Sequence, residues 1–192
     1  SLDVSANQTI LFNSTVSTVD VLTVSAGTLT TLRFSNLILD DASFAGPVQL
    51  DQSLVIQATN DVTFTGEVTG LTGVEDLNIT ADTISLADVS DIDILSLVTV
   101  DYTFGGTLTV NNGVLSITAE TIEIDTAATF TANAGIMLIP LDAASTIGLG
   151  GIAGDLAPGQ FNLSEAELQA LSSTGVLTIG RADLSGDITF HT

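Results

Sequence analysis

Short bursts of alternating apolar and polar residues recur along this chain, and their spacing constrains the fold more than any other feature. Most bursts have apolar side chains at the first and third of three positions, as in Leu108-Thr109-Val110 and Ile122-Glu123-Ile124. This alternation has the period of two that a β-strand imposes on its side chains, and not the helical period of 3.6. Turn residues such as Asn111-Asn112-Gly113, where Gly113 suits a positive φ, separate the bursts. The sequence therefore predicts an all-β chain of short strands.

The distance between bursts predicts how the strands are arranged. From Leu108 onward the burst centres fall near residues 109, 116, 123, 130 and 138. Three such steps make about 22 residues, and a repeat of about 20–25 residues with about three short strands is typical of one rung of a parallel β-solenoid. Thr63 and Ser85 are also 22 residues apart, and Val55 and Asn78 are 23 apart. Hairpin meanders favour longer strands and two-residue turns, so the short bursts of this sequence favour a solenoid over a meander.

We therefore expect a single solenoid domain over residues 1–192, with rungs in residues 1–145 and a terminal module in residues 146–192. Strands are also expected at Ile10 to Phe12, Val19 to Val24 and Leu29 to Leu39, where the repeat is less regular. If most of the chain forms rungs, about eight of them stacked at ~4.8 Å give a rod about 40 Å long.

One segment departs from the strand pattern. Ser164-Glu165-Ala166-Glu167 is a capping box, in which the Ser164 hydroxyl and the Glu167 carboxylate each accept an amide hydrogen at the start of a helix. We expect a short helix over Glu165–Ser172, which Gly175 can end. Two roles remain open: a cap on one end of the solenoid, which would cover unpaired strand edges, or an insertion between rungs. Strands are expected to resume at Val176–Ile179 and Ile188–Phe190.

The charge composition excludes several function classes. Only Arg33 and Arg181 are basic, against 23 acidic residues, so the formal net charge is −21. Because only 13% of residues are charged and 45% are hydrophobic, a disordered acidic tail is excluded. Two arginines cannot supply the phosphate contacts of a nucleic-acid-binding protein or a polybasic contact with anionic lipid. With 28 Thr and 17 Ser, hydroxyl groups take the place of basic side chains.

Cysteine and apolar runs narrow the possibilities further. The chain has no Cys, so it forms no disulfide and no thiolate metal site. The longest apolar run, from Ile136 to Ile139, ends at Pro140 and is far shorter than the ~20 residues of a membrane span, so no membrane insertion is expected. Because the first residue is Ser1 and no signal peptide is evident, we interpret the chain as a mature fragment or an excised piece.

Two regions carry motifs of a known module. The tail reads Thr146-Ile147-Gly148-Leu149-Gly150-Gly151, then Phe161-Asn162-Leu163-Ser164-Glu165-Ala166-Glu167-Leu168, then Leu177-Thr178-Ile179-Gly180 and Gly186-Asp187-Ile188-Thr189. It resembles the I-x-L-G-G, L-S-x-A-E-L, L-x-I-G and G-x-I pattern of giant bacterial exoproteins similar to filamentous haemagglutinin. The body, with Asp61-Val62-Thr63-Phe64-Thr65-Gly66-Glu67-Val68 and Val74-Glu75-Asp76-Leu77-Asn78-Ile79-Thr80-Ala81, resembles their VTFNGxV and LxVTA repeats.

This resemblance implies a right-handed parallel β-helix and export to the bacterial cell surface, often by two-partner secretion. It implies a role in adhesion or in a surface filament and supplies no catalytic residues. The secretion domain of such exoproteins is not evident, so the resemblance implies an internal or C-terminal piece of a stalk.

The best candidate for a site is an acidic cluster in the middle of the chain, which comprises Asp82, Asp88, Asp91, Asp93 and Asp101. Carboxylate pairs on parallel β-helices can cleave polysaccharides, and carboxylates with loop carbonyls can bind Ca²⁺. Asp91-Ile92-Asp93, however, lacks the Gly and closing Glu of an EF-hand loop, and the chain has no Trp and a single Tyr for a sugar platform. We expect a solvated turn face, with Asp88, Asp91 and Asp93 as the alternative Ca²⁺ ligands and no other cofactor.

Three further features are interpreted as structural. His191 is the only His and lies near the chain end, without the partners that a general base needs. The glycine-rich segment from Gly148 to Gly154 has no Lys, so we expect a tight bend and not a phosphate-binding loop. N-x-S/T triplets arise by chance in so hydroxyl-rich a chain, so we expect no glycosylation at those of this sequence, which begin at Asn7, Asn13, Asn78 and Asn162.

The leading expectation is thus a non-catalytic structural and adhesive segment of an extracellular protein. Its expected partners are neighbouring repeats or copies of itself, end to end, and surface glycans of a host or neighbouring cell. The alternatives are a self-stacking filament subunit, a polysaccharide-binding or polysaccharide-cleaving β-helix protein, and a Ca²⁺-dependent adhesion module.

Overall fold

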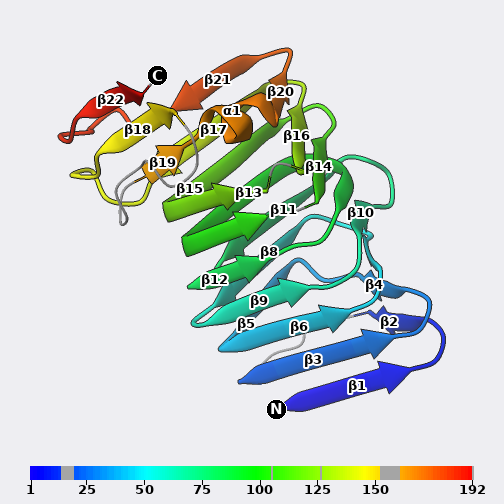
Figure 1. Cartoon of the computed structure of the whole chain (residues 1–192). Helices are drawn as coiled ribbons and strands as arrows, with labels where there is room; N and C mark the ends of the chain where they lie inside the picture. Colours follow the sequence, from blue (N-terminus) through cyan, green and yellow to red (C-terminus); the bar gives the residue numbers. More distant parts are fainter. Residues whose placement is uncertain (14–19, 105, 126, 152–160, 192) are drawn as a thin grey trace.

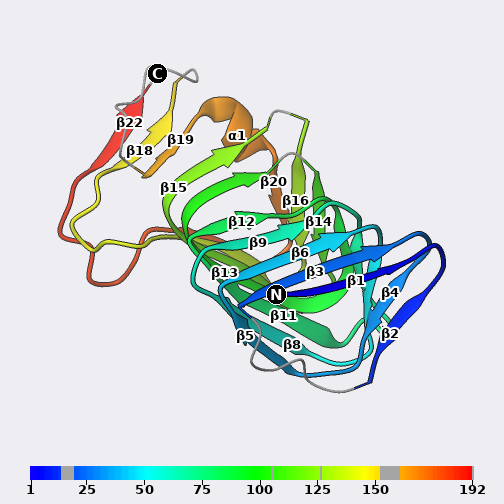
Figure 2. The ribbon, with the colours of Figure 1, turned by 90° about the horizontal axis from the view of Figure 1, so that it is seen from below.

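The protein is an all-β solenoid of parallel strands, as the burst spacing predicts. The computed structural model describes residues 1–13, 20–104, 106–125, 127–151 and 161–191. Of these described residues 62% are in strands, and the strands stack into about six turns. Figure 1 shows the turns rising from the N-terminus to the C-terminal segment, and Figure 2 shows the coil from below. Strand pairs are parallel throughout the described residues.

The strands form three sides, which we call the first, second and third side. The first side contains β1 (Leu2–Ala6), β3 (Val21–Ala26), β6 (Asp41–Ala45), β9 (Asp61–Phe64), β12 (Thr83–Ser85) and the C-terminal parts of β13 (Val89–Phe104) and β15 (Val114–Ile124). The second side contains β2 (Ile10–Phe12), β4 (Thr30–Leu32), β7 (Val48–Leu50), β10 (Val68–Gly70), the start of β13, β14 (Thr107–Val110), β16 (Thr129–Ala132) and β20 (Leu171–Ser173). The third side contains β5 (Asn36–Leu39), β8 (Leu54–Ala58), β11 (Glu75–Thr80), the middle of β13, the start of β15, β17 (Gly135–Pro140) and β21 (Val176–Ile179).

The register confirms the repeat that was read from the sequence. Asn78 pairs with Val55, and Ser85 pairs with Thr63, so residues spaced 23 and 22 apart lie directly above one another. Within the large sheet the shortest step is the 17 residues from Glu75 to Ile92, where a β-bulge interrupts the pairing, so the range of steps in this sheet begins slightly below the predicted 20–25.

The predicted number of rungs was too high. About six turns are complete, against the expected eight, and the rod is correspondingly shorter than the expected 40 Å. The turns at either end lack a described strand on at least one side, and the described residues 141–151 and 161–170 add no strand to the large sheet. Dividing the length of the whole chain by the length of the repeat therefore overestimated the number of rungs.

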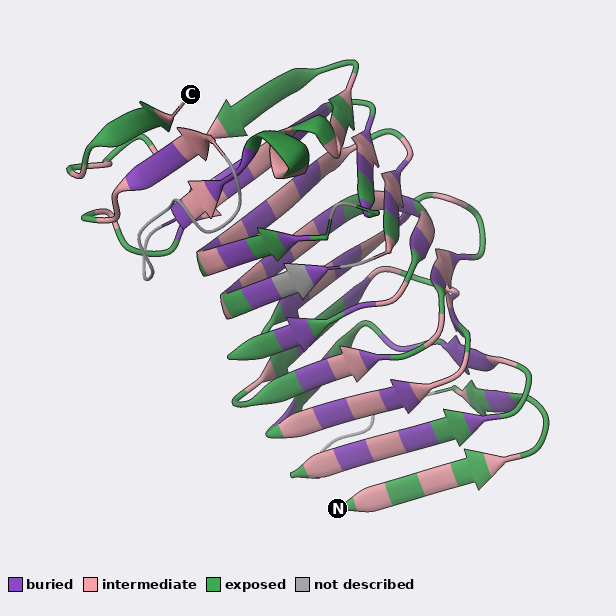
Figure 3. Ribbon diagram, viewed as in Figure 1, coloured by how far each residue is buried: buried purple, intermediate pink, exposed green. Residues whose placement is uncertain are grey.

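The core runs along the inside of the coil as stacked rows of apolar side chains. Figure 3 shows buried and partly exposed residues alternating along most strands, which is the period of two expected for a half-buried strand. Register partners in parallel strands face the same way, so like side chains stack. Phe44 lies on Phe64 with ring centroids 4.7 Å apart and nearly parallel rings, and both side chains are fully buried.

The C-terminal segment adds a small sheet and the helix. A three-stranded parallel sheet contains β19 (Phe161–Leu163), β18 (Ile147–Gly150) and β22 (Ile188–His191), with β18 in the middle. Strand β19 contacts β15, so this sheet continues the first side upward in Figure 1. The chain then returns to the large sheet, because β20 pairs with β16 and β21 pairs with β17.

The capping box is present, but the helix is shorter than predicted. Helix α1 spans Glu165–Gln169; the Ser164 hydroxyl accepts from the Glu167 amide, and the Glu167 carboxylate accepts from the Ser164 amide. The helix ends at Ala170 and not at Ser172, because Leu171 lies in register above Phe130 and its strand joins the second side. Gly175 belongs to the turn after β20 and does not end the helix.

Helix α1 lies between rungs in the sequence and also contacts a strand edge. Its chain position is between β17 and β20, which both belong to the large sheet. Its Glu167 carboxylate accepts a hydrogen bond of 2.9 Å from the amide of Ile124, the last residue of β15. The chain order therefore agrees with the predicted insertion between rungs, and the Glu167 carboxylate satisfies one backbone amide at the edge of β15.

A buried phenol gives a stability prediction. Tyr102 is 1% exposed on an inward position of β13, and its hydroxyl oxygen is buried without a hydrogen-bond partner. Tyr102→Phe removes this unpaired polar group, so we expect the free energy of unfolding to stay equal or rise by about 1 kcal/mol. Urea denaturation measures it, with Phe104→Leu as a control that alters apolar packing on the same strand. A loss of stability for Tyr102→Phe would contradict an unpaired hydroxyl.

Candidate functional site

The five aspartates of the predicted acidic cluster are distributed around the circumference of the coil and make separate contacts. Asp88 accepts from the Thr107 amide at 2.7 Å, and Asp101 accepts from the Thr121 hydroxyl at 2.6 Å. Asp82 acts through its backbone, since its carbonyl accepts from the Thr99 hydroxyl at 2.7 Å. These contacts join successive turns, which is a structural use of residues that the sequence singled out as a candidate site.

Asp91 and Asp93 lie at the corner between the second and third sides. Asp91 has a φ of 52°, a left-handed conformation that Asp tolerates better than most residues, and its carboxylate accepts from the Asn111 side-chain amide at 3.2 Å. The Asp93 carbonyl accepts from the Gly113 amide, while its Oδ1 is buried without a partner. Within the described ranges, no three His, Cys, Asp or Glu side chains are grouped so that they could hold a metal ion. Asp88, Asp91 and Asp93 are thus not brought together as a ligand set.

An open hollow of about 420 Å³ lies over this corner, and we call it the corner hollow. Its lining residues are Gly70, Leu71, Thr72, Gly73, Val74, Asp91, Asn111 and Asn112. Val74 is 66% exposed and Leu71 is 48% exposed, so the hollow presents apolar surface beside the polar groups of Asp91 and the two asparagines.

A buried carboxylate, missed by the sequence reasoning, organises the loop on one side of the corner hollow. Glu75 is only 3% exposed, and its two oxygens accept from the Thr72 hydroxyl at 2.6 Å, the Thr72 amide at 3.1 Å and the Gly73 amide at 2.9 Å. The Val74 amide adds a bond of 3.2 Å. Gly70 leaves space for this carboxylate, because an added Cβ there would lie 2.5 Å from Glu75 Oε2.

These bonds set the protonation of Glu75. Burial by itself raises the pKa of Glu75, but the hydrogen bonds from Thr72 and the backbone amides favour the charged form, and the pKa lies below its ordinary value of 4.5. The available sequence signal was an acidic residue at an inward strand position directly after a Gly-rich turn, Gly70-Leu71-Thr72-Gly73.

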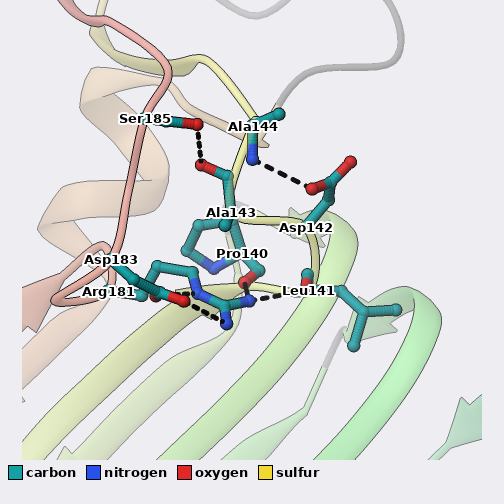
Figure 4. Close-up of polar contacts among 8 residues, drawn as sticks. All are labelled: Pro140, Leu141, Asp142, Ala143, Ala144, Arg181, Asp183 and Ser185. Atoms are coloured by element: carbon teal, nitrogen blue, oxygen red, sulfur yellow. Dashed lines mark hydrogen bonds and ion pairs between the residues drawn. The ribbon is translucent and has the colours of Figure 1, made fainter.

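Arg181 ties the C-terminal segment to the last turns (Figure 4). Its guanidinium donates to the Leu141 carbonyl at 2.6 Å and to the Pro140 carbonyl at 3.3 Å, and it pairs with Asp183 at 2.6 Å. The hydrogen bond to Asp183 raises the pKa of Arg181 and lowers the pKa of Asp183. Ser185 adds a bond to the Ala143 carbonyl at 3.1 Å. Arg181 therefore has a structural role. The scarcity of basic residues in the sequence was a signal that could have pointed to it.

A second open hollow, of about 370 Å³, lies beside this group. Its lining residues are Glu120, Leu141, Asp142, Ala143 and Arg181. Because the guanidinium is engaged with two carbonyls and one carboxylate, the hydrogen-bond donors that it presents to a ligand are largely used.

Two of the remaining sequence candidates lie in the C-terminal segment, where part of them is described. His191 lies on β22 and pairs with Gly150. The expected bend falls at Gly150 and Gly151, which have φ values of 86° and 73°, and the Gly151 carbonyl accepts from Glu165 at the helix start. Residues 152–154 of that segment lie outside the described residues. Glycosylation of the four Asn-x-Ser/Thr triplets is not addressed by the structure.

Comparisons with known proteins returned no match, whether against family models, curated proteins or solved structures. The described part of the chain contains no helix that is long and apolar enough to cross a membrane. The fold and the local geometry are therefore the observations on which a functional proposal can be built.

The Glu75 loop gives a pH-dependent prediction. A group whose pKa is lowered in the folded state stabilises the fold above its unfolded pKa, and this contribution is lost as the pH falls through the folded pKa. We expect Glu75→Gln to lower the free energy of unfolding by about 2 kcal/mol at pH 7, because the charged acceptor is lost. The difference from the wild type should shrink progressively below pH 4.5. Urea denaturation across this range measures it.

The exposed Glu123 of β15 provides a matched control for this substitution. Glu123→Gln should change the free energy of unfolding by no more than about 0.5 kcal/mol, both at pH 7 and below pH 4.5. A Glu75→Gln effect that stays constant into the acid range would contradict a role for the ionised carboxylate.

Proposed function

We propose that this chain is a non-catalytic structural and adhesive segment of an exported bacterial surface protein, of the kind that filamentous haemagglutinin-like exoproteins contain. The observation that carries the proposal is the parallel strand pairing on all three sides through about six turns. Each turn buries its apolar residues against the turns above and below, so a rod of about 30 Å follows from the parallel-strand spacing. Stacked repeats of this kind give an elongated, rigid protein surface.

The second side offers the most uniform surface for adhesion. Its outward central positions carry uncharged hydroxyl or amide side chains in two in-register series, Gln49, Thr69 and Ser90, and then Thr109, Thr131 and Ser172. The first side differs, because carboxylates of Asp41, Asp61 and Asp101 point outward at related positions. With a net charge of −21, we infer that neutral glycans are favoured over anionic polymers as binding partners.

Adhesion under flow tests this proposal. Beads coated with the protein should be retained on neutral glycans, with and without a Ca²⁺ chelator, and should release no soluble sugar. The double substitution Thr109→Glu and Thr131→Glu should lower retention several-fold by adding charge to the second side. Ser96→Glu with Ser116→Glu, at neighbouring positions of the third side, is the matched control.

Each other outcome of the flow experiment would contradict part of the proposal. Release of sugar would indicate a polysaccharide-cleaving enzyme, and loss of retention with chelator would indicate a Ca²⁺-dependent module. No retention on any glycan would leave the adhesive role without support.

Self-stacking into a filament is a second candidate, favoured by exposed inward-facing residues in the last strands. Phe190 is 76% exposed and Ile188 is 49% exposed, although they are in register with Leu149 and Ile147, whose strand packs on the core. Within the described residues β22 pairs along one edge only, and its unpaired edge is a ready template for another strand. A second copy offers β1, which lies on the same side and runs in the same direction.

Electron microscopy and sedimentation test stacking. We expect concentration-dependent filaments for the wild type and short particles for Phe190→Asp, because the substitution places a charge in an apolar contact. Thr189→Asp, on the opposite face of β22, should leave the filaments intact. Monodisperse particles of the wild type at high concentration would exclude this candidate.

A further inference from the structure

The turn between β14 and β15 contains Asn112-Gly113, which is the only Asn-Gly pair in the sequence. Asn112 is exposed and lines the corner hollow. Gly113 has no Cβ to shield its backbone nitrogen. A side-chain amide that is followed by such a nitrogen is chemically vulnerable, so this turn combines water access with a reactive pair.

The reaction needs only water. The Gly113 backbone nitrogen attacks Cγ of Asn112 and forms a new C–N bond; the amide nitrogen leaves as ammonia, and the attacking nitrogen loses its proton. A water molecule then opens the five-membered ring at either carbonyl, which yields Asp or isoaspartate. No electrons are transferred, and each event replaces a neutral amide with a carboxylate.

In the folded protein the attacking nitrogen is engaged between turns. The Gly113 N–H donates to the Asp93 carbonyl at 2.9 Å, and Gly113 packs closely against Asp93 and Ile94 of the turn below. The neighbouring Asn111 amide donates to the Ile92 carbonyl at 2.8 Å. The ring can form only when the Gly113 N–H leaves Asp93, which requires local opening of the stack.

We propose that Asn112 is a deamidation site of this chain and that the hydrogen bond between turns, from Gly113 to Asp93, holds the reaction back in the native state. Isoaspartate adds one atom to the backbone just before Leu115, whose register with Leu95 builds the third side. The new carboxylate also lies in the corner hollow beside Asp91. Each opening of this turn that leads to deamidation thereby leaves a permanent covalent change. The reaction does not depend on any adhesive function of the chain.

Peptide mass spectrometry after incubation at mildly alkaline pH tests the proposal. In the native protein the Asn112 peptide should keep its amide, while in urea it should deamidate about tenfold faster or more. Asn60 and Asn133, which precede Asp61 and Ala134, are internal controls and should react slowly in both states. Equal Asn112 rates in native and unfolded protein, or an unfolded rate no higher than those of the controls, would overturn the proposal.

Two matched variants test whether the opening is local. Leu115→Ala and Leu37→Ala each leave a cavity in the third side, since both leucines are fully buried, but only Leu115 lies next to the turn. We expect Leu115→Ala to raise the Asn112 rate in the folded protein several-fold and Leu37→Ala to leave it within about twofold. Equal acceleration by both variants would show that global unfolding controls the reaction and would overturn the protective role of the Gly113 bond.

Discussion

The hydrogen bonds between successive turns are the interaction on which the rest of this structure depends. A strand of three to six residues cannot bury its apolar face alone, and it gains stability only when the turns above and below share its register. Val55 and Asn78, or Leu37 and Ile56, occupy equivalent positions because backbone groups pair along the whole length. Shifting one turn by a single residue would move its inward side chains to the solvent side, so register and core specify each other.

This dependence explains where the polar residues lie. Carboxylates at turns accept hydrogen bonds from the next rung, as Asp88 does from Thr107, while Glu75 accepts from the loop that precedes its own strand. Arg181 performs a related task with carbonyls at the end of β17 and beside it. The scarcity of base therefore leaves few ion pairs, and local hydrogen bonds between hydroxyls, amides and carboxylates take their place on the described surface.

Much of the fold could be predicted, and much less of the site. The burst centres near residues 109, 116, 123, 130 and 138 fall on the second, third, first, second and third sides in turn. The acidic cluster was selected because its members are close in sequence, yet a solenoid places sequence neighbours on different sides, and Asp88 and Asp93 contact Thr107 and Gly113 at different corners of the next turn. Glu75 was overlooked because three of its four hydrogen-bond donors are the backbone amides of Thr72, Gly73 and Val74, whose direction depends on loop conformation and not on residue type.

The sequence by itself determined the all-β class, the repeat and the capping box, since each follows from local spacing and residue type. The tertiary structure decided how far each element extends and what it touches. The helix ends at Ala170 because Leu171 packs above Phe130, a residue 41 positions earlier. The number of complete turns, the burial of Glu75 and the engagement of Gly113 with Asp93 likewise depend on contacts between turns. Such contacts depend on the packing of the whole stack, which no local window of residues contains.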